Sequence, residues 1–570
     1  MSQDNIINIA DRISSLIEDG SLAEAKSITY KLLQIYSDEF SLWFCLGKIN
    51  LLEKDLECAI KAFSRAIEIN PLYLNSYLLL MESLIKKNEL DLALDISNNA
   101  LTVFPLNEMI IEFRGKIFFY KYEFELALDS FKKITETNPS SASAWVGIGN
   151  IYRIMGKFED ALESFNKALG IEKNSSSLYN NRANIYQNLD FYEKAIDDYK
   201  HALKIEPNSI VTMMNLAVLK LKRKDYGSAD DYFRLALKID PNNSEVLFNR
   251  SLLSLALGDF KSGWKNFERR WQTSQQRNTC RTFNKPIWLG EESIKDKTLF
   301  VFAEQGLGDT IQFSRYTKLL KKMGAKIIFE VQEALYEIVQ TIDPDIIIIS
   351  AGDLIPDFDF YCPLLSLPLA FQSDLSNIPN ETPYFFSNRH LNLIWKRKLN
   401  TNNKIKVGLV WKSGFRADNP ESWHINKKRD IRLSSLTPLL ELNDIEIISI
   451  QKDAEAEEGL LKIIDSEWKN KNIKNFSSQI QNFNDTAAII DNLDLVISVC
   501  TSVAHLSASM NKSTWILIPY EHCWRWLADG RRDSPWYPTV RLFRQPKPND
   551  WKSVIDEVVL ELKKITSPKN

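Results

Sequence analysis

A glycine-rich turn between an apolar strand and a helix is the first place where this sequence could hold a charged ligand. The apolar run 298–303 ends at a turn containing Gly306, Gly308 and Asp309, and apolar residues with helical spacing begin at Thr310. Such a turn brings backbone N–H groups and the positive end of a helix dipole to one point, which suits an anion. The glycines would let the backbone approach a ligand. Asp309 could face that ligand, or it could cap the helix.

A second turn of the same kind follows near residue 500. The apolar run 494–499 leads to Thr501 and Ser502, and His505 lies one turn into the expected helix. Thr501, Ser502 and the N–H groups of this helix could hold an anion, and His505 could donate to that anion or polarise the turn. Helix capping by the two hydroxyl residues and a buried structural role for His505 are the alternatives.

Three further residues are candidates for binding the same ligand. Lys412 begins a basic segment, 412–432, that also contains Arg429 and that could clamp an anion. Gln451 follows the expected strand 445–450 and so could face the same ligand. The other charges of the basic segment are expected to be solvated.

The composition argues against several classes of function. The 570 residues include 71 basic and 74 acidic side chains, so a net charge of −3 does not favour a nucleic-acid binder. The six cysteines form no Cys-x-x-Cys pair, which argues against structural zinc and fits a reducing compartment. Neither a secretory signal nor an apolar run of about 18 residues is evident. We therefore expect a cytoplasmic protein with no transmembrane segment, metal or cofactor.

The first half of the chain repeats every 34 residues. Each of six units carries a small residue and, four residues later, an aromatic position. Eight residues after that, five of the units carry a proline, and Lys173 takes its place in the sixth. The small residues are Ala59, Ala93, Ala127, Ala161, Ala195 and Ala229; the aromatic position holds Phe63, Phe131, Phe165, Tyr199 and Phe233, with Ser97 once; the prolines are Pro71, Pro105, Pro139, Pro207 and Pro241. This is identified as the tetratricopeptide pattern, in which a small residue lies where two helices cross and a proline ends the second helix.

Residues 1–275 are therefore predicted to form an all-α tetratricopeptide superhelix of about seven to eight repeats. Its concave groove would recruit a protein or glycan acceptor. Groove contacts are expected from the first helix of each hairpin, with a solvated helix face as the alternative for each residue. They are Asn75, Arg114, Asn150, Asn181, Arg182, Asn215 and Asn249.

Beyond residue 275, strands alternate with helices, which predicts parallel sheets with helices on both faces. Strands are expected at 299–303, 326–331, 345–350, 406–411, 445–450, 494–499 and 514–519. A helix and a polar break at 389–404 divide this half into an N-terminal lobe with its linker, 276–395, and a C-terminal lobe with the tail, 396–570. A ligand cleft is expected between the carboxyl ends of the strands of the two lobes.

This second half resembles the two-lobed GT-B glycosyltransferases, and most closely the family 9 heptosyltransferases. Gly308-Asp309 matches that family's glycine–aspartate loop, and residues 500–506 match its Asp-Thr-Gly-x-x-His-Leu turn in outline. Cys500 and Ser502 stand where that family has aspartate and glycine. The whole chain is similar to bacterial fusions of tetratricopeptide repeats with such a domain. The resemblance implies that Asp309 is the catalytic base and that no metal is needed. It also implies that the anion held by Thr501 and Ser502 and clamped by Lys412 and Arg429 is the diphosphate of a nucleotide sugar, whose base or ribose Gln451 could contact.

Two functions follow from these expectations. The first is a metal-independent glycosyltransferase, which moves a sugar from a nucleotide-sugar donor to a protein or glycan held by the repeats. The second is a repeat scaffold for protein–protein interaction that carries a catalytically silent glycosyltransferase-like domain. Cys500 favours the second, whereas Gly308, Asp309 and His505 favour the first.

Overall fold

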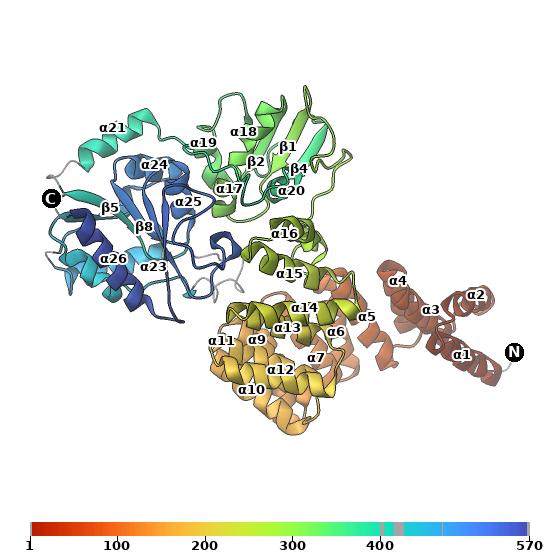
Figure 1. The fold of residues 1–570 in the computed structure, drawn as a ribbon. Coiled ribbons are helices and arrows are strands. Elements are labelled where there is room, and N and C mark those ends of the chain that lie inside the picture. Colours follow the sequence, from red (N-terminus) through yellow and green to blue (C-terminus); the bar gives the residue numbers. More distant parts are fainter. Residues whose placement is uncertain (1–2, 400–403, 415–426, 470, 567–570) are drawn as a thin grey trace. The chain divides into compact units, whose positions relative to one another are not determined.

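The computed structural model describes residues 3–399, 404–414, 427–469 and 471–566 (Figure 1). The chain forms two compact units, residues 1–207 and 208–570. The first unit is all helical. The second contains four more helices of the repeat and two parallel sheets with their helices. The predicted order of helical repeats followed by parallel α/β structure is confirmed, whereas the domain limits at 275 and 395 remain predictions.

The first unit consists of helical hairpins that keep the interval seen in the sequence. From α3 onward, the first helix of each hairpin begins 34 residues after the previous one, at Phe40, Leu74, Glu108, Ala142 and Ser176. The helices are α1 (Gln3–Glu18), α2 (Leu22–Leu33), α3 (Phe40–Leu52), α4 (Leu56–Ile69), α5 (Leu74–Lys87), α6 (Leu90–Val103), α7 (Glu108–Tyr120), α8 (Phe124–Thr137), α9 (Ala142–Ile154), α10 (Phe158–Ile171), α11 (Ser176–Asn188) and α12 (Tyr192–Ile205).

Glycines that face phenylalanine rings allow neighbouring helices of this unit to pack closely against each other. A methyl group on Gly47 would lie 2.5 Å from the Phe63 ring. Gly115 and Gly147 both face the Phe131 ring, where added methyl groups would lie 2.7 and 2.5 Å from it. Each ring therefore fills a space that exists because the facing residue has no side chain. Phe63 and Phe131, two of the repeated aromatic positions, are thus part of the helical core.

This packing predicts opposite effects for one substitution at two helical glycines. Gly47→Ala should lower the free energy of unfolding by about 1–3 kcal/mol, because the new methyl group overpacks against Phe63. Gly170→Ala should raise it by about 0.5–1 kcal/mol, because alanine is the better helix former. A methyl group on Gly170, in α10, would meet no atom within 4 Å. Urea unfolding of both variants tests this, and a stabilising Gly47→Ala would contradict it.

The second unit begins with four helices on the same interval, α13 (Ile210–Lys222), α14 (Tyr226–Ile239), α15 (Ser244–Ala256) and α16 (Phe260–Phe267). The last hairpin shares a core with the α/β structure. Trp264 of α16 is buried, its Nε1 donates to the carbonyl oxygen of Ser373 at 3.0 Å, and its ring centroid lies 5.2 Å from that of Trp524. The helices of this hairpin therefore support the sheets directly.

The first sheet has four parallel strands in the order β3-β2-β1-β4. They are β1 (Thr298–Phe302), β2 (Lys326–Val331), β3 (Ile347–Ser350) and β4 (Phe360–Pro363). The associated helices are α17 (Leu307–Phe313), α18 (Arg315–Lys322), α19 (Tyr336–Val339) and α20 (Leu367–Ala370). One face of this sheet differs from the expectation of helices on both sides. Phe300, Phe302 and Ile328 pack there against Phe283 and Phe358, which lie outside helices, so an aromatic cluster covers that face.

The second sheet has six parallel strands in the order β10-β9-β8-β5-β6-β7, with helices on both faces (Figure 1). Helices α23 and α26 and the 3-10 helix 433–441 pack on one face, and α24 and α25 pack on the other. The strands are β5 (Ile405–Val410), β6 (Ile445–Ser449), β7 (Ile473–Asn475), β8 (Leu495–Val499), β9 (Thr514–Ile518) and β10 (Val540–Arg544); the helices are α21 (Arg389–Lys398), α23 (Ala454–Asp465), α24 (Phe483–Asp491), α25 (Ser502–Ser509) and α26 (Trp551–Thr566).

Candidate functional site

The two glycine- and hydroxyl-rich turns meet within the second unit. One follows β1 and opens α17, and the other follows β8 and opens α25. A methyl group on Gly308 would lie 3.1 Å from Cδ2 of His505 and 3.6 Å from Cα of Ser502. The structure thus brings the 306–309 turn and the 501–505 turn together at the carboxyl ends of two parallel sheets, where α/β proteins bind ligands.

Asp309 is held by two partners at this junction. One carboxylate oxygen accepts the backbone N–H of Gly306 at 3.0 Å, as expected for an acidic residue in the first turn of a helix. The other oxygen forms an ion pair with Arg525, whose Nε also donates to the Gln312 side chain at 2.8 Å. An acceptor hydroxyl would have to replace one of these partners, so the role of Asp309 as a base remains a prediction.

His505 is buried and neutral. Its Nδ1 lies 2.9 Å from the Tyr537 hydroxyl, and its ring stacks on Trp526 at a centroid distance of 5.6 Å. Burial, together with the positive charges of Arg525, Arg315 and Arg429, lowers the pKa of His505 well below its usual value. With Nδ1 engaged by Tyr537, the Nε2 of a neutral imidazole can donate or accept one hydrogen bond, but the ring adds no charge to the site.

The start of α25 carries the features of an anion site. Thr501 precedes the helix in an extended conformation, and its hydroxyl lies 3.0 Å from that of Ser498. Within the described residues, no side chain caps the first N–H groups of α25. The helix dipole and the nearby Arg525 and Arg429 therefore make this point positive. Binding of a ligand by Thr501, Ser502 and the two glycines remains a prediction.

Lys412 and Gln451 are engaged with the protein itself. The Lys412 ammonium pairs with Glu455 at 2.5 Å and with Asp453 at 3.5 Å. The buried Gln451 amide accepts the backbone N–H groups of Trp411 and Lys412 at 3.2 and 3.0 Å and donates to the Lys412 carbonyl oxygen at 3.1 Å. Gln451 thus fixes the end of β5. Arg429 acts electrostatically on His505 and Cys500, while residues 415–426 of the same segment lie outside the described residues.

The sequence did not identify Arg525 and Arg315 as candidate site residues. Arg525 lies between two tryptophans, in Trp524-Arg525-Trp526. Arg315 is buried, and its guanidinium donates to the carbonyl oxygens of Gln312, Pro379 and Trp536. An arginine between two tryptophans was the available signal, because guanidinium groups stack on aromatic faces. The Arg525 guanidinium indeed lies 4.5 Å from the centre of the Trp524 ring.

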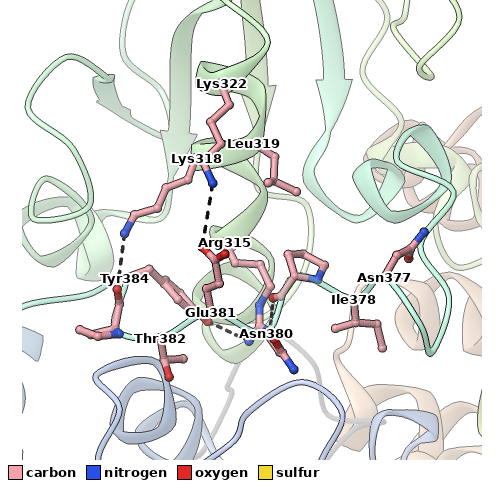
Figure 2. Close-up of a pocket in the computed structure, with 12 residues that line it drawn as sticks. Arg315, Lys318, Leu319, Lys322, Asn377, Ile378, Asn380, Glu381, Thr382 and Tyr384 are labelled. Carbon is pink, nitrogen blue, oxygen red and sulfur yellow. Dashed lines mark hydrogen bonds and ion pairs between the residues drawn. The ribbon is translucent and has the colours of Figure 1, made fainter.

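A cavity of about 540 Å³ lies elsewhere in the second unit (Figure 2). It is formed by α18 and by the segment 377–384, and none of the predicted site residues lines it. The Lys318 ammonium donates to the Pro383 carbonyl oxygen at 3.4 Å, and the Lys322 ammonium lies 3.9 Å from the Glu381 carboxylate. Arg315 also lines this cavity, and its guanidinium lies 4.4 Å from the centre of the Tyr537 ring, whose hydroxyl contacts His505.

A network of buried charged side chains includes Glu304, which precedes the glycine turn in the chain. Arg270 is fully buried and pairs with Glu268 at 2.6 Å and with Glu304 at 3.1 Å, and it donates to the Ser366 hydroxyl at 2.7 Å. Glu304 directly follows the β1 region and also accepts the backbone N–H of Leu365 at 3.1 Å. Burial raises the pKa of Glu304 to about 7 in spite of the neighbouring guanidinium.

This raised pKa predicts a pH dependence of stability. Between pH 4.5, the ordinary Glu value, and about pH 7, the folded protein binds more protons at Glu304 than the unfolded chain does. The contribution of Glu304 to the free energy of unfolding therefore falls as the pH rises through this window. Glu304→Gln should flatten the dependence in urea unfolding at pH 5, 6 and 8. Glu330→Gln, at a buried carboxylate paired with Arg281, is the control, and an unchanged profile in Glu304→Gln would contradict the assignment.

Two family models decide the nature of the helical hairpins. Models of the tetratricopeptide repeat match residues 142–175 and 174–242. These helices are tetratricopeptide repeats. The same 34-residue interval continues on both sides of the matched residues, from α3 to α16. A search of the curated proteins found no match to the chain.

Several solved structures are similar to the tetratricopeptide part. A tetratricopeptide repeat protein from Parabacteroides merdae is 18% identical, covers 43% of this chain and 97% of its own, and has a TM-score of 0.39. Yeast Tom70 is 21% identical, with 46% and 56% covered and a TM-score of 0.38. The APC/C hetero-tetramer Cut9–Hcn1 is 19% identical, with a TM-score of 0.36. That match covers 42% of this chain and about half, 48%, of the other.

Tetratricopeptide repeats are protein-interaction modules, and some of their predicted groove residues are already engaged. Arg182 donates through two nitrogens to the Asp198 carboxylate, at 2.7 and 2.8 Å. The Asn249 amide donates to the Glu245 carbonyl oxygen at 2.9 Å. Arg114 lies over the Phe118 ring at 5.5 Å. Contacts of these residues with a partner remain predictions.

Two findings concern the described residues as a whole. No helix among them has the length and apolar character needed to cross a lipid bilayer. No group of three or more His, Cys, Asp or Glu side chains among them is arranged to hold a metal ion.

Proposed function

We propose that this protein is a glycosyltransferase that moves a sugar from a nucleotide-sugar donor to a protein or glycan recruited by its tetratricopeptide repeats. The observation that carries this proposal is the meeting of two turns, at Gly308 and His505, at the carboxyl ends of two parallel sheets. The resemblance to two-lobed, metal-independent glycosyltransferases gives the reaction class. In this proposal, residues 276–395 and 396–570 are the two lobes.

Glycosyl transfer requires positive charge for the departing diphosphate and a base for the acceptor hydroxyl, and the junction contains candidates for both. A departing diphosphate needs positive charge, which the N-terminus of α25 and the guanidinium groups of Arg525 and Arg429 supply. The acceptor hydroxyl needs a base, and Asp309 is the carboxylate at the junction. As the diphosphate attracts Arg525, the ion pair with Asp309 weakens and one carboxylate oxygen becomes available to the hydroxyl. Donor binding and base activation are thus coupled through Arg525.

A specific observation favours a second candidate, a repeat scaffold with a silent domain. Both oxygens of Asp309 have partners, and Lys412 and Gln451 are engaged with the protein. Cys500 stands where the resembling family has aspartate, and the Cys523 thiol together with burial raises the pKa of Cys500 well above the usual value. A neutral thiol does not replace a carboxylate. In this case the junction would bind an anionic partner without turning it over.

The two candidates are separated by incubating the full chain with a panel of UDP-, GDP- and ADP-sugars and measuring release of the nucleoside diphosphate. Release that depends on Asp309 supports the transferase. Nucleotide binding without release supports the silent domain. If no nucleotide sugar binds at concentrations on the order of 1 mM, the transferase proposal fails.

A further inference from the structure

Helix α18 carries three cationic side chains that line the cavity formed with the segment 377–384. They are Arg315, Lys318 and Lys322. Their spacing of three and four residues places them on one face of the helix. Figure 2 shows the Lys318 and Lys322 side chains extending from α18 toward the segment 377–384. One wall of the cavity is therefore positively charged.

Arg315 is a buried cation without a counter-anion. It is 3% exposed, and a guanidinium group stays protonated in proteins. Its Nε and Nη1 donate to three backbone carbonyl oxygens, those of Gln312, Pro379 and Trp536, and its Nη2 donates to the Tyr384 hydroxyl at 3.1 Å. Among the residues that the structure describes, no carboxylate pairs with it. Because a buried charge is normally paired, the cavity beside this guanidinium is a place for an anion.

The remaining lining residues indicate the charge and the body of that anion. Of the described residues that line the cavity, Glu381 alone is acidic, and its carboxylate is 90% exposed and lies 3.9 Å from the Lys322 ammonium. Three cations and one exposed carboxylate suit a ligand with two negative charges, as a phosphate monoester has near pH 7. Leu319 and the buried Ile378 add apolar surface. The volume of about 540 Å³ is typical of small-molecule sites.

We propose that this cavity binds a phosphate monoester of a small organic molecule. The phosphate accepts hydrogen bonds from the Lys318 and Lys322 ammonium groups and from the Arg315 Nη2, while the organic group lies against Leu319 and Ile378. Lys318 can turn to the phosphate because its present bond to the Pro383 carbonyl oxygen is long, at 3.4 Å. The site uses none of the residues proposed to bind a nucleotide sugar.

The test is calorimetric titration of phenyl phosphate into the full chain at pH 8 and low salt. We expect a Kd on the order of 1 mM or lower, weaker binding of benzoate, which carries one charge, and no binding of phenol. The double variant Lys318→Gln/Lys322→Gln should lower the affinity at least about tenfold, because it removes two charge-assisted hydrogen bonds. Lys321→Gln is the matched control on the same helix, since Lys321 pairs with Asp343 and Asp345 at 2.5 and 2.6 Å and does not line the cavity.

Glu381→Gln should change the affinity in the opposite direction. It removes the negative charge that lies beside Lys322, so phenyl phosphate should bind about two- to threefold more tightly. A general loss of structure in this part of the protein would not produce a gain in affinity. The lysines and Glu381 are chosen for substitution because Arg315 also holds the backbone at Pro379 and Trp536.

Four results would overturn the proposal. They are no binding of phenyl phosphate at about 1 mM, benzoate binding as tight as that of phenyl phosphate, an equal loss of affinity in Lys321→Gln and in the double lysine variant, and a loss of phenyl phosphate binding in Arg525→Ala, which would place the ligand at the junction of the two turns. Phenyl phosphate contains neither a nucleotide nor a sugar. Binding that persists in a protein that binds no nucleotide sugar would therefore support this site while the transferase proposal fails.

Discussion

Asp309→Asn is expected to slow sugar transfer about 10²–10⁴-fold, the usual contribution of a positioned base. Asparagine keeps the volume of the side chain and can still accept the backbone N–H of Gly306. It cannot take the proton of an acceptor hydroxyl. The nucleoside diphosphate should still bind, because the positive charge of the α25 N-terminus and of Arg525 and Arg429 remains when Asp309 loses its charge. The expected signature is a fall in kcat with little change in the KM for the donor.

The matched control for this prediction is Asp343→Asn. Asp343 is also a carboxylate in an ion pair, with Lys321 at 2.5 Å, but it lies away from the two turns. Its replacement should leave kcat within about twofold of the wild type. A wild-type rate in Asp309→Asn would remove Asp309 from the chemistry, and an equal loss in both variants would indicate a general loss of structure.

Arg270→Met is expected to lower the free energy of unfolding of the second unit by about 3–5 kcal/mol, the usual cost of removing one partner from a buried ion pair. Arg270 is fully buried and contacts the carboxylates of Glu268 and Glu304 and the Ser366 hydroxyl. Methionine fills much of the space but leaves both carboxylates without their cation. Because Glu304 lies between β1 and the glycine turn, this change should also loosen the position of Gly306.

Arg269→Met is the control, because this neighbouring side chain is only partly buried and, among the residues that the structure describes, donates to Gln272 alone, at 3.2 Å. It should change the free energy of unfolding by no more than about 0.5 kcal/mol. The double variant Arg270→Met/Glu304→Gln should recover part of the loss, since it removes one of the stranded charges. Denaturant unfolding measures all three, and an Arg270→Met variant as stable as Arg269→Met would contradict the account of the network.

The helical half could be predicted from the sequence almost residue by residue. Each hairpin repeats the same local rules, so Pro71 and its equivalents fix the helix ends and Gly47 and Phe63 fix the crossing. Three strands of the α/β half were not predicted. β4, with Pro363 as its last residue, β7, with three residues, and β10, where Arg541 interrupts the apolar pattern, were all missed. Their positions depend on pairing with a neighbouring strand rather than on a local signal.

Only the two backbone turns of the site could be predicted from the sequence. The glycine turn and the turn before His505 were both recognisable, because strand, turn and helix follow one another directly in the chain. Arg525 could not be assigned to the site, because it lies more than 200 residues from Asp309 and only the fold brings them together. Local sequence likewise did not reveal that Gln451 hydrogen bonds to the end of β5.

The central claim is that the two turns form one anion-binding site. The most direct measurement is calorimetric titration of UDP, GDP and ADP into the full chain and into Gly308→Leu, whose added side chain would fill the space next to His505. Arg525→Ala is the second variant and Arg532→Ala, at an exposed arginine paired with Glu557, is its control. The account predicts that at least one nucleotide binds with a Kd of about 1 mM or lower. Its affinity should fall at least tenfold in Gly308→Leu and in Arg525→Ala but not in Arg532→Ala. No binding to the wild type, or wild-type binding to Gly308→Leu, would contradict it.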